Sequence, residues 1–345
     1  MEKYVGIDVS MKESAVCIVD QSGKVIRELK ALSDPAALGR ILRDEGCSGA
    51  RIGLEAGALS GWLHDGLKVE GFDVVLLETR HVQAAISAMA VKTDRNDARG
   101  IAQMLRLGWF KSVHAKSADS QEIRALLTAR KLLTRKRVDL DIGMRGILRS
   151  FGLKVGQIGR ARFDARLREL ITGNTMLEKV IGAMLEARAA LARELAELHR
   201  MVLRLTRESE VCKRLMTVPG VGPIASLTFV AAVDDPHRFR SSKAIGAHFG
   251  LTPRKYQSGE VDVTGHITKA GDASVRTVLY EAANAIITLR VKPSALKAWA
   301  LRLVKRRGAK RAKVALARKL AVLMHRMWVD GTEFEFGAGD AQPAT

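Results

Sequence analysis

The chain has 345 residues, 47% of them hydrophobic, and a formal net charge of +20. This length and apolar content allow about two or three domains with their own cores. No run of eighteen apolar residues and no signal-peptide core are present, so we expect a soluble, cytoplasmic protein with no membrane partner. Three widely spaced cysteines and eight scattered histidines argue against a disulfide framework or a zinc site.

The positive charge lies entirely in the later part of the chain. Residues 1–115 contain 15 Lys and Arg against 15 Asp and Glu, whereas residues 116–345 contain 42 against 22. A neutral first part joined to a basic second part is typical of an active module attached to one that binds a polyanion, and we expect nucleic acid. The alternative is a basic protein whose charge serves solubility alone.

Residues 1–115 alternate segments that predict strands and helices in a mixed α/β domain. Apolar runs bounded by turns predict strands, and amphipathic runs, one with a proline in its first turn, predict helices. The expected strands are 3–8, 14–20, 25–32, 50–55 and 72–78, and the expected helices are 34–46, 59–71 and one starting at Thr93.

Residues 116–208 predict a basic helical region with a coiled coil. The segment 119–150 reads as one long helix, with eight Lys and Arg against two acids between residues 124 and 149. Farther along, nine positions are separated alternately by four and three residues, and eight of the nine are apolar. This heptad pattern predicts a coiled-coil seam within the chain or between chains. An ordinary helical hairpin is the alternative. The heptad is Leu177, Ile181, Met184, Arg188, Leu191, Leu195, Leu198, Val202 and Leu205.

Residues 209–330 predict a mainly helical domain. The turn "PGVGP" at 219–223 resembles a helix-hairpin-helix element, whose exposed N–H groups suit a phosphate. A loop-rich stretch follows, and the last helices carry nine basic residues and no acid between 302 and 319. The composition of residues 331–345 is typical of a disordered tail.

Four carboxylates are placed where they can converge. Asp8 and Glu55 end predicted strands, and Asp94 and Asp97 lie three apart on a predicted helix, so they share one face. Converging carboxylates repel one another unless cations lie between them, and oxygen ligands suit Mg²⁺. Two such ions can promote phosphodiester cleavage. The alternative is that Asp94 and Asp97 only charge and solvate a helix N-terminus.

Three segments around these residues resemble the acidic motifs of the DEDD transposases of bacterial insertion sequences. They are "YVGIDVSMK", "IGLEAG" and "VKTDRNDAR", and "VPGVGPIAS" and "FGLTPRKYQSGE" resemble that family's C-terminal transposase domain. The resemblance implies a RuvC-like, RNase H-type fold for the first domain. It also carries the metal-binding, catalytic tetrad over to Asp8, Glu55, Asp94 and Asp97.

The same resemblance nominates a nucleophile in the basic stretch "TPRKYQSGE". Ser258 matches the family's serine that joins covalently to a DNA strand. Chemistry alone leaves Tyr256 equally plausible, because a serine before a glycine is most often a turn. Cations near these sites predict nucleic-acid contacts, namely Lys92, Arg95, Arg254, Lys255, Lys269 and Arg276.

The resemblance further implies DNA ends and target DNA as partners, a structured guide RNA, and a dimer or tetramer whose subunits share the active site. It places the active protein on the bacterial nucleoid. Three alternatives remain at this point: a RuvC-like junction nuclease without serine chemistry, an actin-like sugar kinase suggested by "VGIDVS", and a non-catalytic nucleic-acid-binding protein.

Overall fold

The computed structural model describes residues 2–87, 91–289 and 291–337. It contains two compact units, Met1–Lys116 and Ser117–Thr345. The boundary between them falls one residue after the end expected for the first domain. The helical region before residue 208 and the helical region after it both belong to the second unit, although the sequence suggested a division between them. No helix in the described part of the chain is both long and apolar enough to cross a membrane.

The first unit is a mixed α/β domain, as expected, built on one sheet of order β3-β2-β1-β4-β5-β6. Strand β1 pairs antiparallel with β2 and parallel with β4, so it lies in the centre of the sheet. The sequence did not predict the short helix α3 or the two-residue strand β6. The strands are β1 Lys3–Asp8, β2 Glu13–Asp20, β3 Val25–Leu32, β4 Arg51–Glu55, β5 Asp73–Leu77 and β6 Ser112–Val113, and the helices are α1 Pro35–Asp44, α2 Ser60–Val69, α3 Thr79–Ile86 and α4 Asp94–Arg106.

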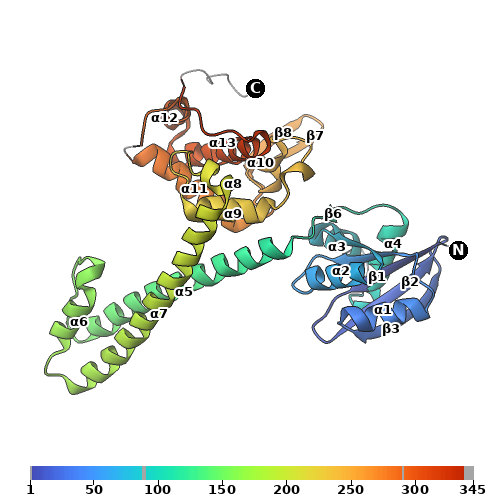
Figure 1. Cartoon of the computed structure of the whole chain (residues 1–345), viewed down its shortest axis with the longest axis horizontal. Helices are drawn as coiled ribbons and strands as arrows, with labels where there is room; N and C mark the ends of the chain where they lie inside the picture. Colours follow the sequence, from blue (N-terminus) through green and yellow to red (C-terminus); the bar gives the residue numbers. More distant parts are fainter. Residues whose placement is uncertain (1, 88–90, 290, 338–345) are drawn as a thin grey trace. The chain divides into compact units, whose positions relative to one another are not determined.

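The two faces of this sheet carry different helices (Figure 1). Val5 and Ile7 of β1 belong to the core shared with α1 and α2. Because side chains alternate along a strand, Gly6 and Asp8 point to the opposite face. There Ala98 of α4 packs with the buried side chains of β2. The face that carries Asp8 is therefore the face covered by α4.

The second unit begins with a helical arm. Helices α5 and α7 lie side by side as a hairpin, with α6 at its far end (Figure 1). All nine heptad positions of α7 are buried or half-buried, so this face packs within one chain. The bounds are α5 Ala118–Ser150, η1 Arg160–Arg162, α6 Phe163–Ile171 and α7 Thr175–Glu208.

The polar position of the heptad is satisfied inside the arm. The Arg188 guanidinium donates to Asp141 Oδ1 at 2.6 Å and to Asp164 Oδ1 at 2.8 Å, and it lies over the ring of Phe163. A buried cation needs such partners, so this position fixes how α5, α6 and α7 align.

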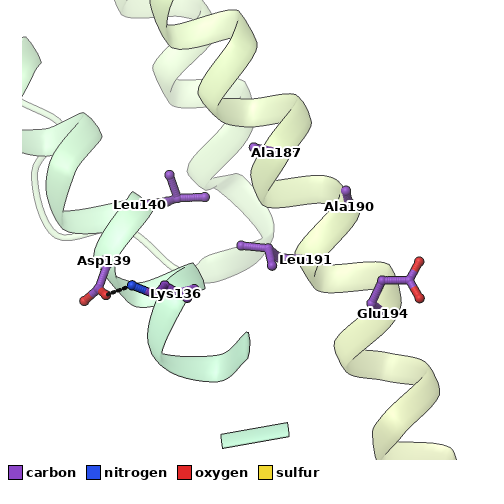
Figure 2. Close-up of a pocket in the computed structure, with 7 residues that line it drawn as sticks. All are labelled: Lys136, Asp139, Leu140, Ala187, Ala190, Leu191 and Glu194. Carbon is purple, nitrogen blue, oxygen red and sulfur yellow. Dashed lines mark ion pairs between the residues drawn. The ribbon is translucent and has the colours of Figure 1, made fainter. Parts of the chain in front are cut away.

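Nearer the base an open groove of about 640 Å³ separates α5 from α7 (Figure 2). It is lined by Lys136, Asp139, Leu140, Ala187, Ala190, Leu191 and Glu194.

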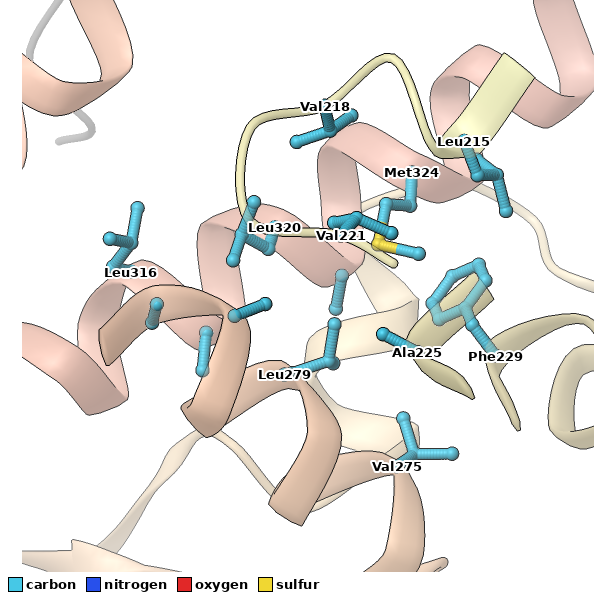
Figure 3. Close-up of a cluster of buried hydrophobic side chains, with 14 of the residues drawn as sticks. Leu215, Val218, Val221, Ala225, Phe229, Val275, Leu279, Leu316, Leu320 and Met324 are labelled. Atoms are coloured by element: carbon cyan, nitrogen blue, oxygen red, sulfur yellow. The ribbon is translucent and has the colours of Figure 1, made fainter. Parts of the chain in front are cut away.

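The C-terminal part of the second unit is mainly helical, as expected, around one large apolar core (Figure 3). The 219–223 turn joins α8 to α9, and Gly220 at φ +82° lies against α11, where an added Cβ would be 2.8 Å from Ala282 O. The elements are α8 Glu210–Leu215, α9 Pro223–Val233, η2 Pro236–Arg238, α10 Ala244–His248, β7 Pro253–Ser258, β8 Val261–Ile267, α11 Ala273–Thr288, α12 Ala295–Arg307 and α13 Ala309–Asp330.

Two aspartates fasten the start of α5 to this core. Asp234 accepts hydrogen bonds from the Ser117 and Ser120 hydroxyls at 2.5 and 2.6 Å, and it does so from a backbone with φ +66°. Asp272 forms a 2.5 Å ion pair with Arg124. The root of the arm is thus held at two points.

The expected disordered tail is in part packed. The backbone N–H of Phe334 donates to Thr217 Oγ1 at 2.9 Å, and its ring contacts the C-terminal core. A composition argument misses this contact because two phenylalanines stand before the polar stretch. Residues 338–345 lie outside the described residues.

Candidate active site

Asp8 and Glu55 come together because their strands are parallel neighbours. In the register of β1 and β4, Ile7 lies opposite Leu54, so the next residue of each strand is an acid at the same end of the sheet. Both side chains are half-buried. The carboxyl ends of parallel strands are a common position for ligand-binding groups.

Two glycines allow α4 to approach these strands closely. An added Cβ on Gly6 would lie 2.1 Å from Ala98 O, and one on Gly53 would lie 2.7 Å from the Leu105 side chain. Any larger residue at Gly6 would push the α4 backbone away from the sheet. The glycines thus place the first turn of α4 over the ends of β1 and β4.

The first turn of α4 contributes the other two carboxylates. Thr93 caps the helix by accepting a 3.2 Å hydrogen bond from the Asn96 N–H. Asp94 and Asp97 follow in that turn, where negative charge is favoured by the helix dipole. Asp97 is half-buried and Asp94 exposed. The helix dipole stabilises the negative charges of Asp94 and Asp97, but it does not explain why these charges raise the pKa of Asp8.

The four carboxylates influence one another electrostatically. Burial raises the pKa of Asp8 to about 6, and the negative charges of Asp97, Asp94 and Glu55 add to the rise. Burial also raises the pKa of Glu55, with a further contribution from Asp97. Lys92 partly opposes the rise in pKa at both residues. Asp8 therefore interacts electrostatically with all three of the other acids, and the convergence of the four carboxylates on one site stays a prediction.

This region has the donor chemistry of a divalent-cation site. Asp97 Oδ1 is buried and has no hydrogen-bond partner, which is costly unless a cation or water approaches it. As the side chains stand, no three His, Cys, Asp or Glu residues in the described ranges are arranged to enclose a metal ion. We read the carboxylates as repelling one another without an ion. Their oxygens, including the orphaned one, nevertheless fit a hard cation.

Neighbouring side chains that the sequence did not single out support the site. Thr79, at the start of α3, donates to Ala56 O at 2.7 Å and also offsets part of the pKa rise of Glu55. Glu28 of β3 binds Arg99 at 2.7 Å and Arg95 at 3.6 Å. Arg95, expected to contact nucleic acid, is therefore ion-paired within the domain, whereas Lys92 lies beside the carboxylates. A threonine directly after a strand was the only available signal for Thr79.

Ser258 lies in a different setting, at the end of an exposed hairpin of β7 and β8. Every residue of β7 is exposed, and Ser258 pairs with Val261 across a turn in which Gly259 has φ +55°. Lys255 in the same strand pairs with Asp262 at 3.2 Å, and the ring of Tyr256 is 65% exposed. Arg254 is exposed beside them. The hairpin thus presents both candidate nucleophiles and two cations to solvent.

Two other predicted nucleic-acid contacts lie at the base of this hairpin. Arg276 donates through Nη1 to three backbone carbonyls, those of Phe249, Ala270 and Gly271, at 3.2, 2.6 and 3.0 Å. Lys269 has φ +55°, and its N–H donates to Gly250 O at 3.1 Å. Arg276 in this geometry holds the loop on which the hairpin stands.

Comparison with known proteins bears on both units. A model described as "Transposase IS116/IS110/IS902 family" matches residues 212–300, and an IS110-type DEDD transposase model matches residues 5–152. A probable family 20 transposase of Pseudomonas aeruginosa is 30% identical over 280 residues, covering 79% of this chain and 82% of that protein. The chain belongs to the IS116/IS110/IS902 family of transposases.

Further similarities extend over almost the whole transposase. The transposase for insertion sequence element IS1111A of Coxiella burnetii is 28% identical over 345 residues, covering 97% of this chain and 92% of that one. A putative transposase of Sinorhizobium fredii is 31% identical over 257 residues, covering 73% and 66%. A solved structure of T. thermophilus RuvC with a Holliday junction substrate is 14% identical, with a TM-score of 0.26, and covers 33% of this chain and 100% of that one.

Family membership decides between the main alternatives. The protein is an insertion-sequence transposase that cuts and rejoins DNA, and the sugar-kinase and non-catalytic readings are wrong. Nucleases of the DEDD type generally depend on divalent metal ions, which agrees with the donor chemistry around Asp97.

Proposed function

We propose that this transposase excises and inserts its element through two chemical centres, the acidic tetrad and Ser258. The observation that carries the proposal is the placement of four carboxylates at the ends of the parallel strands β1 and β4 and in the first turn of α4, where Asp97 Oδ1 is buried without a hydrogen-bond partner. The raised pKa of Asp8 agrees with this placement. Such crowding of negative charge at strand ends costs stability, and a protein tolerates it where a cation or a reaction requires it.

In this proposal Asp8, Glu55, Asp94 and Asp97 hold Mg²⁺. When bound, the metal supplies a Lewis acid for phosphodiester chemistry. Thr79 steadies the Glu55 end of the site, and Gly6 keeps α4 close enough for its aspartates to participate. Lys92 is positioned to attract the DNA backbone while it offsets the negative charge of the carboxylates.

Ser258 is the proposed nucleophile. Its Oγ forms a bond to a DNA phosphorus as the P–O bond to one sugar oxygen breaks. The serine proton leaves to a base, and the departing sugar oxygen takes up a proton to become a free hydroxyl. A hydroxyl of another DNA strand later breaks the Oγ–P bond, so the strand is rejoined without loss of the ester to water. Exposure of the hairpin suits a residue that must reach a DNA backbone, and Arg254 supplies positive charge beside it.

Two further features belong to the proposal. A structured guide RNA would choose donor and target DNA, supported by the excess of basic residues after position 116 and by the resemblance of the motifs. A homodimer or tetramer would let one subunit's serine work with another's carboxylates. The arm packs its heptad face within one chain, so oligomer contacts would use other surfaces.

The test is excision from a plasmid that carries the gene with its flanking DNA, measured by PCR across the rejoined ends. We expect wild type to give the product and Asp8→Ala and Ser258→Ala to give none. Tyr256→Phe is the matched control in the same hairpin and should retain excision. A product that persists in Ser258→Ala would remove the serine step and favour metal-dependent cutting of the junction-nuclease kind.

RNA guidance is tested separately. Protein is purified after expression with or without the element's flanking non-coding segments, and bound RNA is extracted and sequenced. A discrete RNA that restores excision to RNA-free protein would support guidance. Excision by RNA-free protein alone would overturn it without affecting the serine step.

A further inference from the structure

The corner between α12 and α13 carries a dense group of exposed cations. Helix α12 ends in a basic turn, Gly308 turns the chain with φ +78°, and α13 begins with more basic residues. We define the α12–α13 corner by six side chains, all exposed: Arg302, Lys305, Arg306, Arg307, Lys310 and Arg311.

These cations have no acidic partners. In the described ranges none of the six forms an ion pair with a carboxylate, whereas elsewhere in the same unit Arg124 pairs with Asp272 and Arg326 with Asp330. The chain therefore does supply acids where a cation serves the fold. Six like charges left without them repel one another, and that repulsion works against the folded corner.

Two of the six also oppose local helix stability, whereas Lys305, Arg306 and Arg307 lie in the last turn of α12, where the helix dipole favours cations. Lys310 and Arg311 stand at the N-terminus of α13, which has no acid in its first turn and no side-chain cap. Cations at that end are unfavourable with the helix dipole. Residues that destabilise their own helix are expected mainly at functional sites. An anion bound at the corner would relieve both the repulsion among the cations and their unfavourable interaction with the helix dipole.

Other basic residues of the same helices serve packing and mark the limits of the site. Lys313 lies over the ring of Tyr280 at 5.9 Å, and Lys319 lies over Trp299 at 4.8 Å. Both side chains are half-buried. The remaining exposed cations at the turn have no comparable ring contact in the described chain.

We propose that the α12–α13 corner is a binding site for the phosphate backbone of a nucleic acid, separate from the carboxylates and from the serine hairpin. The inference rests on the chain being a transposase, and it names a contact surface that the chemistry of strand exchange does not require. An arginine guanidinium can donate to two phosphate oxygens at once, and a lysine ammonium attracts a phosphate as a point charge. Both contacts are to the nucleic-acid backbone, so the corner does not read the base sequence. Duplex DNA and folded RNA share that backbone.

The test compares two triple variants of the full chain with the same change in net charge. The corner variant is Arg306→Gln, Arg307→Gln and Lys310→Gln. The control is Arg193→Gln, Arg200→Gln and Lys213→Gln, three exposed cations that already pair with Glu194, Glu197 and Glu210. Binding to a random-sequence duplex and to an RNA hairpin is measured by fluorescence anisotropy, without divalent metal, across a KCl series.

We expect the corner variant to weaken binding about tenfold or more near 0.1 M salt and to reduce the slope of log K against log[salt] by about 2 to 3. The control variant should change the slope by less than about 1. Loss on the duplex alone assigns the site to DNA, and loss on the hairpin alone assigns it to RNA. An unchanged slope on both probes, or an equal loss in the control, overturns the proposal. Because no cleavage is measured, failure of the serine mechanism would not affect this result.

Discussion

The acidic site and the serine hairpin are built on opposite physical principles. Asp8 and Glu55 are half-buried at strand ends under a tightly packed helix, and their pKa values are raised as a result. Ser258 lies in a two-stranded hairpin whose first strand is fully exposed. The first site is made by the core of its domain, whereas the second is a surface held only at its base.

This difference determines how each site reveals its role. Like charges forced together by packing have no structural benefit, so their presence alone indicates a cation or a reaction. An exposed serine carries no such cost. Its role depends on what approaches it, and the resemblance to the family was needed to distinguish it from Tyr256. Substitutions can test whether the carboxylates depend on the packing of α4 and whether the serine hairpin depends on the residues at its base.

The largest effect is expected from Gly6→Val. Its Cβ would lie 2.1 Å from Ala98 O and 2.4 Å from Ala102 N, both backbone atoms that cannot turn away. We expect excision to be lost and the free energy of unfolding to fall by about 3 kcal/mol, measured by urea denaturation. Gly49→Ala, with no atom within 4 Å of the added Cβ, is the control and should behave as wild type. Normal excision by Gly6→Val would show that α4 need not lie against β1.

A second test separates the charge of Asp8 from its shape. Without divalent metal near pH 8, Asp8→Asn should increase the free energy of unfolding by about 1 kcal/mol, a value reduced for solvent screening. The raised pKa means that wild type loses stability as pH rises through about 6. The advantage of the variant should therefore shrink as pH falls below about 6 and vanish only below about pH 4, where Asp8 of the unfolded chain is protonated as well.

We expect Mg²⁺ to raise the Tm of wild type, and the same variant should lose that increase because one of the proposed ligands is gone. Asp44→Asn, an exposed carboxylate of α1, is the control and should keep that increase. If Asp8→Asn destabilised the metal-free protein at pH 8, the carboxylates would not be in mutual repulsion.

The sequence predicted the first domain well because its signals are local. The apolar strands, the proline at the start of α1 and the pair Asp94 and Asp97 each report their own element. Parallel pairing of β1 with β4, which aligns Asp8 with Glu55, is a long-range feature that no local signal in the sequence predicts. Gly6 and Gly53 were overlooked because a glycine in a strand does not reveal which helix packs on it.

The second unit was less predictable from its sequence. The hairpin of β7 and β8 was read as loop because β7 is mostly polar and exposed on both faces. In β8, Val261, Val263 and Ile267 do alternate with polar residues, and this strand signal was overlooked. The heptad positions of α7 are buried or half-buried in an arm where α7 contacts α5 of the same chain, and periodicity alone could not identify that partner. Arg276 was read as a phosphate contact because a basic residue in the first turn of a helix gives no sign of the loop carbonyls around it.

An intermediate effect is expected at Arg276. Removing the guanidinium leaves the carbonyls of Phe249, Ala270 and Gly271 without their donor, so Arg276→Ala should lower the free energy of unfolding by about 2 kcal/mol. Amides of β7 and β8 should exchange faster with deuterium. Arg276→Lys should recover part of the loss. Unchanged exchange together with weaker DNA binding would instead support the phosphate contact.

A smaller effect, similar in size to that of Asp8→Asn, is expected at Asp272, which fastens the arm rather than building a site. Burial alone would raise the pKa of Asp272, but Arg124 and the N–H groups of Ser274 and Val275 hold it below its usual value. The ionised group therefore adds stability above its ordinary unfolded pKa, and that stability is lost as pH falls through the lower folded-state pKa.

Asp272→Asn keeps the helix cap and removes only the charge, so it should cost about 1 kcal/mol near pH 7 and progressively less below about pH 4. Asp330→Asn, which breaks the exposed pair with Arg326, should cost about 0.3 kcal/mol and serves as the control. In Arg124→Gln the effect of Asp272→Asn should shrink, because the two charges then no longer interact. An undiminished cost in that background would mean that the backbone N–H groups alone stabilise the carboxylate. The root of the arm would then be held by Asp234 and not by the ion pair.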